Sequence, residues 1–430
     1  MGRAEIAGGR MDRQSMTRPD GGLPGAGQGR LLGLMLLLCA ANAAFWLPQL
    51  AQVLAGLAGS DPQPAFANRD LANYWLAGKL ALAGDVTPLF RQETHQAALE
   101  AAFGLQGMEI RNWSYPPPFL FVAAPLGLMP YPAAYAVFLL ASGGWFLWTV
   151  RSLVRNREGD GAGSGFGLVV VLLLPFLILQ VIAGQNGFFF GAAFLQALLW
   201  RGSRPMAAGL MIALLTLKPQ LGLLVPVLLL AERRFAVIAW AAIFAALLAG
   251  LSLLVFGPGI WRAFFTDTLP YQRFVASHWE GLFLTMIPTW FAALRALGIG
   301  ADLALALHLA LTLPLGLAAL AALWRAPDDW TRARLVLAAT FVLTPYAFNY
   351  DLGALLAMIA ASLAAGRRTD GWTAAGGALV MALPLWTPLA GRPDVLLVMP
   401  PLVMSGLLGV LVLDVFRPGW SLAPGRKVMS

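Results

Sequence analysis

Cysteine and histidine are scarce in this chain, since its 430 residues contain one cysteine, Cys39, and three histidines. A single cysteine cannot form an intramolecular disulfide, and the scattered histidines lack the spacing of metal ligands. The chain also lacks a glycine-rich phosphate-binding motif and any spacing typical of a serine–histidine–acid triad. The sequence therefore argues against a disulfide scaffold, a zinc enzyme and nucleotide-driven chemistry. We expect neither a metal nor a cofactor.

Charged residues are also scarce in this chain. Only 12% of the residues are charged, whereas a soluble domain has about 25%. Instead 59% are hydrophobic, and the mean hydropathy is +0.72. Apolar stretches such as 31–58, 235–256, 301–324 and 372–389 approach or exceed the ~20 residues with which a helix crosses ~30 Å of hydrocarbon. Because helices satisfy their own backbone hydrogen bonds, we predict an all-α, polytopic bundle of about 10–12 membrane helices, half-helices included.

The basic residues lie between the apolar stretches. A net charge of +8 would suggest nucleic acid as the partner of a soluble protein, but here clusters such as Arg233/Arg234 separate the spans. If all these clusters are cytoplasmic, 20 of the 29 Lys and Arg residues lie inside, which is the positive-inside pattern. We therefore expect both termini in the cytoplasm, with tails at 1–30 and 417–430 around a membrane domain at 31–416. Membrane lipids, and no nucleic acid, are the expected partners.

Two polar segments interrupt the apolar pattern on the expected outer side. The first, 58–115, contains two helical patterns at 70–83 and 91–103 that are amphipathic enough to lie along the membrane surface. The second, 257–300, carries aromatic residues among charges, as interfacial helices do. The apolar stretch 116–129 is too short to cross unaided. It fits a re-entrant segment or a short tilted crossing.

Residues 206–231 are apolar but are interrupted by Lys218-Pro219-Gln220. Proline removes a backbone donor and disfavours helix in the residue before it, so one kinked span or two half-helices would fit. Arginine pairs at both ends favour two half-helices. A lysine among apolar residues costs several kcal/mol unless it reaches water, an anion or a partner. Lys218 therefore either snorkels to water or holds an anion such as a phosphate.

Asp70 is the acid of greatest interest in the first polar segment. It stands directly before a helical pattern that Asn68 can cap, so its carboxylate would lie in the first turn, where free N–H groups favour an anion. Tyr74 is on the same helical face, with Trp75 beside it. An acid and an aromatic shelf, formed by the rings of Tyr74 and Trp75, would then meet at the membrane surface. An ordinary helix-capping aspartate is the alternative.

Other polar side chains stand at breaks on the expected outer face. Gly184-Gln185-Asn186-Gly187 offers two amides, although a tight turn explains it equally well. Thr344-Pro345-Tyr346 and Tyr350-Asp351 form a second break, where Asp351 is either a helix cap or part of a site. Such groups suit sugars and phosphates. The candidate substrate-binding residues are Tyr74, Trp75, Tyr115, Gln185, Asn186, Lys218, Gln220, Arg273, His278, Tyr346 and Asp351.

Five motifs follow one another along the chain, namely Asp70-Leu71-Ala72-Asn73-Tyr74-Trp75, Tyr115-Pro116-Pro117-Pro118, Gly184-Gln185-Asn186-Gly187, Leu217-Lys218-Pro219-Gln220 and Thr344-Pro345-Tyr346 through Asp351. In this order they resemble glycosyltransferase family 87, over roughly residues 65–365. No single motif decides the resemblance. Five in the same order are hard to attribute to shared hydrophobicity.

The resemblance implies the GT-C architecture and an α-mannosyltransferase-like activity with polyprenyl-phosphate-mannose as the donor. It implies that Asp70 is the catalytic aspartate, which takes the proton of an acceptor hydroxyl while the sugar inverts. Lys218 and Arg273 would offset charge on the departing phosphate. The implied acceptor is a lipid or glycan at the outer face of a bacterial cytoplasmic membrane. Leu71 departs from the aromatic residue that many members have after the aspartate.

Two other classes of protein fit parts of the pattern. A transporter or flippase for a lipid-linked sugar would use Lys218 and Asp351 as substrate or coupling-ion sites. It would not need a long amphipathic loop with an acid at its start. A non-catalytic scaffold of envelope assembly is the third reading, and it predicts that no polar substitution changes a lipid or glycan product.

Overall fold

The chain folds entirely into helices and connecting loops within the residues that the computed structural model describes, which are 26–59, 64–158, 163–364 and 394–417. Most of the two expected tails and the expected span at 372–389 lie outside the described residues. The first helix begins at Ala26, about one turn before the expected start of the membrane domain.

Six helices of the described part are long and apolar enough to cross a membrane: α1 (Ala26–Ala58), α6 (Tyr131–Glu158), α7 (Gly163–Ala183), α12 (Phe235–Phe256), α17 (Ala301–Arg325) and α22 (Met399–Phe416). Their outer faces are apolar and open, and Leu254 on α12 is 84% exposed. Water would oppose such exposure by about 25 cal/mol per Å², whereas lipid chains cover it. The prediction of a polytopic helical membrane bundle is confirmed.

Three shorter helices form the centre of the bundle. They are α8 (Gly187–Trp200), α18 (Asp329–Leu343) and α19 (Gly353–Ala364), and most of their residues are buried. Helix α19 packs against α7 and α8. These central helices begin or end at the polar breaks that the sequence singled out, so the breaks lie inside the bundle.

The apolar stretch around Lys218 is broken as predicted. It forms α9 (Pro205–Leu215), α10 (Pro219–Gly222) and α11 (Val225–Ala231). Lys218 lies at the first break with non-helical backbone angles, because the following proline excludes it from a continuous helix. Helix α9 lies tightly on α12, since a Cβ added at Gly209 would meet the Cβ of Trp240 at 2.5 Å. Small residues permit this close approach of membrane helices.

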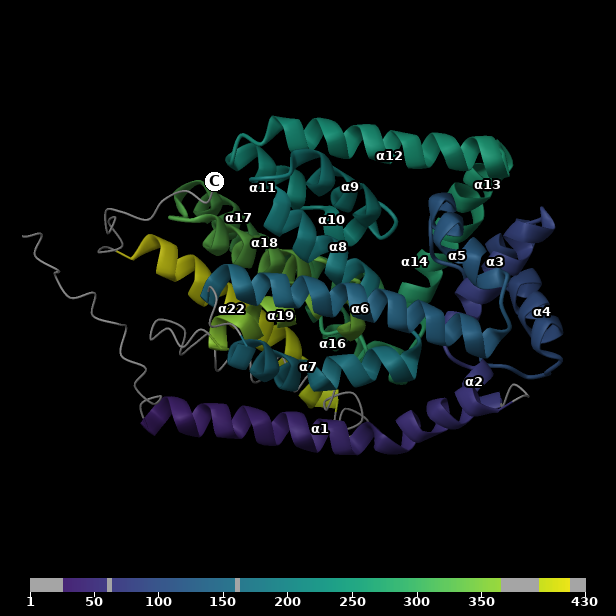
Figure 1. Cartoon of the computed structure of the whole chain (residues 1–430), viewed down its shortest axis with the longest axis horizontal. Helices are drawn as coiled ribbons and strands as arrows, with labels where there is room; N and C mark the ends of the chain where they lie inside the picture. The colour runs from purple at the N-terminus through teal and green to yellow at the C-terminus, as the bar shows by residue number, and fades with distance from the viewer. Residues whose placement is uncertain (1–25, 60–63, 159–162, 365–393, 418–430) are drawn as a thin grey trace, which may run out of the picture.

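Both polar segments fold into short helices. The first segment and the apolar stretch after it form α2 (Pro64–Ala67), α3 (Leu71–Ala83), η1 (Thr87–Phe90), α4 (Gln92–Phe103), η2 (Pro117–Phe119) and α5 (Leu120–Gly127). The second forms α13 (Pro258–Ala263), the π-helix η4 (Phe264–Thr268), α14 (Leu269–His278), α15 (Leu282–Thr285) and α16 (Trp290–Ala296). Helices α3, α4, α5 and α13 gather at one end of the molecule, at the right in Figure 1.

The first two turns of helix α3 are buried on all sides, which corrects the expected amphipathic pattern with one open face. All residues from Leu71 to Gly78 are buried. The cause is a close crossing with α5, where a Cβ at Gly78 would meet the carbonyl oxygen of Ala123 at 2.2 Å. Helix α4 does have one buried face, formed by residues four apart, as an amphipathic helix has.

The short apolar stretch after the three prolines packs on α3. Helix α5 has eight residues, which reach only ~12 Å at 1.5 Å per residue. The chain then enters α6 at Tyr131. Together with η2, which leads directly into it, α5 forms the apolar helical stretch Pro117–Gly127. This stretch is shorter than the ~20 residues of a full crossing, and the re-entrant segment and the short tilted crossing both stay predictions.

Candidate active site

Asp70 lies between α2 and α3, where its backbone N–H donates to the carbonyl oxygen of Ala183 at the end of α7 at 3.0 Å. Asp70 itself is the residue before the helix, and its side chain makes no capping hydrogen bond. Asn68, the expected cap, instead accepts the backbone N–H of Glu109 at 3.1 Å. The capping interpretation is therefore wrong for both residues, and the Asp70 carboxylate is available for other contacts.

Arg111 is the first partner of the Asp70 carboxylate, and sequence reasoning missed it. Its Nη1 donates to Oδ1 of Asp70, and its Nη2 donates to the carbonyl oxygen of Asn68 and to Glu109 Oε2, the last at 3.1 Å. The Arg111 side chain is largely buried, while the Asp70 side chain is 31% exposed. The sequence offered four basic residues in the first polar segment and no signal to choose among them.

Helix α4 holds the backbone of Arg111. The His95 ring Nδ1 lies 3.1 Å from the Arg111 carbonyl oxygen, and the Arg111 N–H donates to Gln96 Oε1 at 3.3 Å. Burial lowers the pKa of His95 from 6.5 to about 4. The ring is therefore neutral at pH 7, and its Nδ1–H donates to the carbonyl.

Gln185 is the second partner of the carboxylate and begins a chain of hydrogen bonds. Its Nε2 donates to Asp70 Oδ2, and its Oε1 accepts the Tyr74 hydroxyl at 3.0 Å. The Tyr74 and Tyr115 hydroxyl oxygens are 2.9 Å apart, and Asn186 Nδ2 donates to the Tyr115 hydroxyl at 2.7 Å. Segments more than 100 residues apart in the sequence thus meet in one row of hydrogen bonds. We call this row the polar line; its side chains are Asp70, Gln185, Tyr74, Tyr115 and Asn186.

A buried ion pair lies at the other end of this line. Lys218 Nζ is 2.5 Å from Asp351 Oδ1 and 3.5 Å from Asn186 Oδ1. Lys218 is 7% exposed and Asp351 2%. Asp351 Oδ2 also accepts the Phe348 N–H at 3.3 Å. Lys218 therefore does not snorkel to water, and its charge is neutralised by a carboxylate.

The donors along the line all point the same way. Because the Tyr74 proton goes to Gln185, the Tyr115 hydroxyl must donate to Tyr74, and Asn186 donates to Tyr115. Burial raises the pKa of both tyrosines, so both keep their protons. Aligned hydrogen bonds of this kind strengthen one another. The line runs from the Lys218 ammonium to the Asp70 carboxylate and fixes which end of the Gln185 amide faces the acid.

A family model described as glycosyltransferase family 87 matches residues 113–345, more than half of the chain. The chain belongs to glycosyltransferase family 87. Comparison with curated proteins and with solved structures finds no match. The match to glycosyltransferase family 87 includes Tyr115, Asn186 and Lys218, while Asp70 and Asp351 lie outside its limits. The chain is accordingly a multi-pass membrane glycosyltransferase.

Six of the site residues predicted for this family 87 glycosyltransferase meet in one network with Asp70: Tyr74, Tyr115, Gln185, Asn186, Lys218 and Asp351. The expected aromatic shelf is not exposed, because Tyr74 and Trp75 are both buried. Trp75 donates its Nε1–H to the Met129 carbonyl oxygen at 2.9 Å and packs between rings, so its contacts hold α3 in place.

Besides Trp75, four predicted residues stand apart from the network. Arg273 and His278 are exposed on α14, where the His278 ring stacks on Phe274 with 4.2 Å between centroids. Gln220 is half-buried on α10, two residues after Lys218. Tyr346 packs on Phe348, whose N–H holds Asp351.

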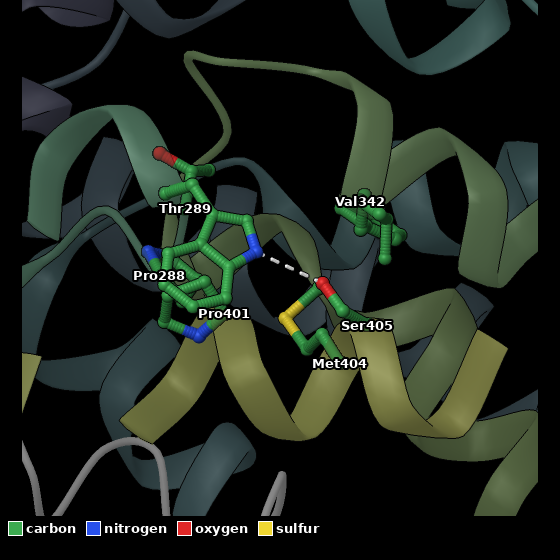
Figure 2. A pocket seen from close by; sticks show the side chains of 8 residues that line it. Pro288, Thr289, Val342, Pro401, Met404 and Ser405 are labelled. Atoms are coloured by element: carbon green, nitrogen blue, oxygen red, sulfur yellow. Dashed lines mark hydrogen bonds between the residues drawn. The ribbon is translucent and has the colours of Figure 1, made fainter. Parts of the chain in front are cut away.

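A hollow between α16, α18 and α22 offers no second site in the glycosyltransferase (Figure 2). Trp290 on α16 donates its Nε1–H to Ser405 Oγ on α22 at 3.0 Å. The space is too narrow to hold a water molecule. It is a packing contact between helices.

Proposed function

We propose that the chain moves a hexose, mannose in the first instance, from a polyprenyl-phosphate-linked donor to a lipid or glycan acceptor, with Asp70 as the general base. The acceptor hydroxyl oxygen attacks the anomeric carbon while the bond from that carbon to the phosphate oxygen breaks. The hydroxyl proton passes to Asp70, the polyprenyl phosphate leaves, and the sugar inverts.

The environment of Asp70 is the observation that carries this proposal. A carboxylate offers about four lone-pair positions, and the contacts with Arg111 and Gln185 occupy one on each oxygen. The side chain is also partly open, at 31% exposure. An acceptor hydroxyl therefore finds a free lone pair on a carboxylate whose orientation is already set, which is the geometric requirement for a general base.

The cations near the site suit different tasks. Arg111 orients the Asp70 carboxylate for the proton transfer. Lys218 is neutralised by Asp351, so we propose that it acts by holding Asn186. Arg273 is exposed on α14, and we keep it as the proposed partner of the departing phosphate.

The side of the membrane is also part of the proposal. We propose that both termini are cytoplasmic and that Asp70 works at the outer face of a bacterial cytoplasmic membrane, as the distribution of basic residues suggests. After Cys39→Ala, single cysteines at the exposed positions Ser114 and Ser203 report opposite sides. In intact cells a membrane-impermeant thiol reagent should label position 114 only. Labelling of position 203 alone would reverse the orientation.

Family membership favours this enzyme over the transporter or flippase and over the scaffold. The decisive experiment compares envelope glycolipids by mass spectrometry in a deletion strain complemented with wild type or Asp70→Asn. Removal of a general base costs on the order of 10²–10⁴ in rate. The product should therefore disappear while the protein stays expressed and folded.

Asp85→Asn is the matched control. The Asp85 carboxylate is exposed and accepts the Thr87 N–H and hydroxyl at 3.0 and 2.6 Å, contacts that lower its pKa. An asparagine oxygen can accept the same bonds. Normal product from Asp70→Asn, or equal damage from the control, would refute the assignment of the base.

A further inference from the structure

A cavity of about 370 Å³ lies between the two polar segments, away from the polar line. Its walls come from η1 and the start of α4 on one side and from α13 and the π-helix η4 on the other, and they include Phe90, Arg91, Thr94, Gly259, Ile260 and Asp267. This volume falls within the roughly 300–1,000 Å³ of small-molecule sites. Segments 170 or so residues apart in the sequence thus enclose a space of ligand size.

Two opposite charges line the cavity without pairing. Arg91 and Asp267 both contribute to its walls, yet within the described ranges neither side chain forms a salt bridge with the other or with a third residue. A guanidinium presents five N–H donors and a carboxylate presents only acceptors. The cavity therefore offers both hydrogen-bonding functions at once.

The remaining wall residues add a hydroxyl and apolar surface. The Thr94 hydroxyl, in the first turn of α4, shares its one proton between the carbonyl oxygens of Pro88 and Arg91 at 2.9 and 3.0 Å, so its oxygen is free to accept. Phe90 and Ile260 supply apolar contact. Donors, acceptors and an apolar wall together match a sugar ring, which carries hydroxyl groups at its edge and C–H groups on its faces.

The carboxylate also selects against the obvious competitor. A phosphate would be attracted by Arg91, but Asp267 in the same cavity would repel it, because like charges at short range are unfavourable. A neutral polyhydroxylated ligand meets no such conflict. Charge therefore favours a neutral saccharide over a phosphate.

The backbone at Asp267 is unusual. It belongs to the π-helix Phe264–Thr268, and single π turns are rare and often mark functional sites. The next residue, Thr268, has a buried hydroxyl without a hydrogen-bond partner among the described residues. The Glu93 carboxylate on α4 adds to burial in raising the pKa of Tyr271 on α14, so charged and polar groups of the two polar segments lie close together in space.

We propose that this cavity binds a neutral saccharide, and, as an extension of the proposed transferase function, that the saccharide is the sugar portion of the acceptor. Helix α4 connects the cavity with the active site. Thr94 lines the cavity, while the next two residues, His95 and Gln96, hold the backbone of Arg111. A ligand in the cavity is therefore anchored to the helix that positions the partner of Asp70.

Binding is measured directly on the purified full chain in nanodiscs, because many detergents carry sugar headgroups. The probes are maltose and mannobiose, with inorganic phosphate as the competitor, and saturation-transfer NMR or tryptophan fluorescence reports their binding. Arg91→Gln and Asp267→Asn should weaken disaccharide binding roughly tenfold or more, as loss of a hydrogen bond to a charged group does. The matched control is Arg262→Gln, an exposed arginine on α13 outside the cavity wall, which should bind as wild type.

A third variant tests the space itself. A Cβ at Gly259 meets no atom within 4 Å, so Gly259→Leu should fill the cavity, abolish disaccharide binding and preserve thermal stability. Wild-type binding by all three cavity variants, or binding of phosphate in place of the disaccharides, would overturn the proposal.

Asp70→Asn separates this proposal from the catalytic one. That variant should bind disaccharides normally, since Asp70 does not line the cavity. If Asp70→Asn still makes product while the cavity variants lose disaccharide binding, the saccharide site is supported and the assignment of Asp70 as the base is wrong. If it makes no product but disaccharides bind nowhere in the cavity, the reverse holds.

Discussion

Breaking the buried ion pair between Lys218 and Asp351 should destabilise the protein strongly. If Lys218 were a lone buried charge, Lys218→Met would leave the fold intact, because the desolvation cost of the charge would disappear with it. The structure reverses that expectation, since Asp351 is itself buried and would remain without its counter-ion. At an effective dielectric constant of ~20, charges 2.5 Å apart attract by roughly 7 kcal/mol.

The desolvation of the two ions offsets most of that attraction, at several kcal/mol each. Removing one partner loses the attraction but keeps the desolvation cost of the other, so Lys218→Met and Asp351→Asn should each cost about 3–5 kcal/mol. The double variant should be much closer to wild type, because no charge is left buried. Unfolding free energies from SDS titration in mixed micelles complete the cycle. The reasoning would be refuted if the double variant lost as much stability as the two single variants together. A Lys218→Met variant as stable as wild type would also refute it.

Three further predictions concern the surroundings of the site. Tyr115→Phe leaves the Asn186 amide without an acceptor and interrupts the polar line. The amount of glycolipid product should fall about tenfold or more while the fold persists. A wild-type amount of product would show that activity does not need the polar line. The pKa of the His95 ring is about 4 in the folded protein and 6.5 in the unfolded chain. The free energy of unfolding should therefore fall by up to about 3 kcal/mol as the pH drops from 6.5 to 4, because the unfolded chain binds the proton first. His95→Asn should remove this pH dependence from melting curves. Gly78→Leu should abolish folded protein in size-exclusion profiles, because its Cβ would lie 2.2 Å from a backbone oxygen of α5, whereas Gly33→Leu, with nothing within 4 Å, should be tolerated.

The class of the fold could be predicted from the sequence, because membrane insertion depends on local quantities. Apolar length decides which segments cross, and a proline at position 219 decides where one of them breaks, whatever the rest of the chain does. The polar residues that interrupt these segments could be singled out for the same reason. Asp70, Lys218 and Asp351 are conspicuous since charge within or beside apolar stretches needs a partner.

Only the tertiary structure decided which of these residues meet. Lys218 and Asp351 are 133 residues apart, and Arg111 is 41 residues from Asp70. Helical periodicity reports on neighbours within a few residues and carries no information on such pairings. The same limit explains the misjudged helix α3, whose pattern resembled that of a surface helix until packing of α5 against Gly78 buried it. Close packing of segments distant in sequence thus assembled the site from residues that the sequence could name but could not bring together.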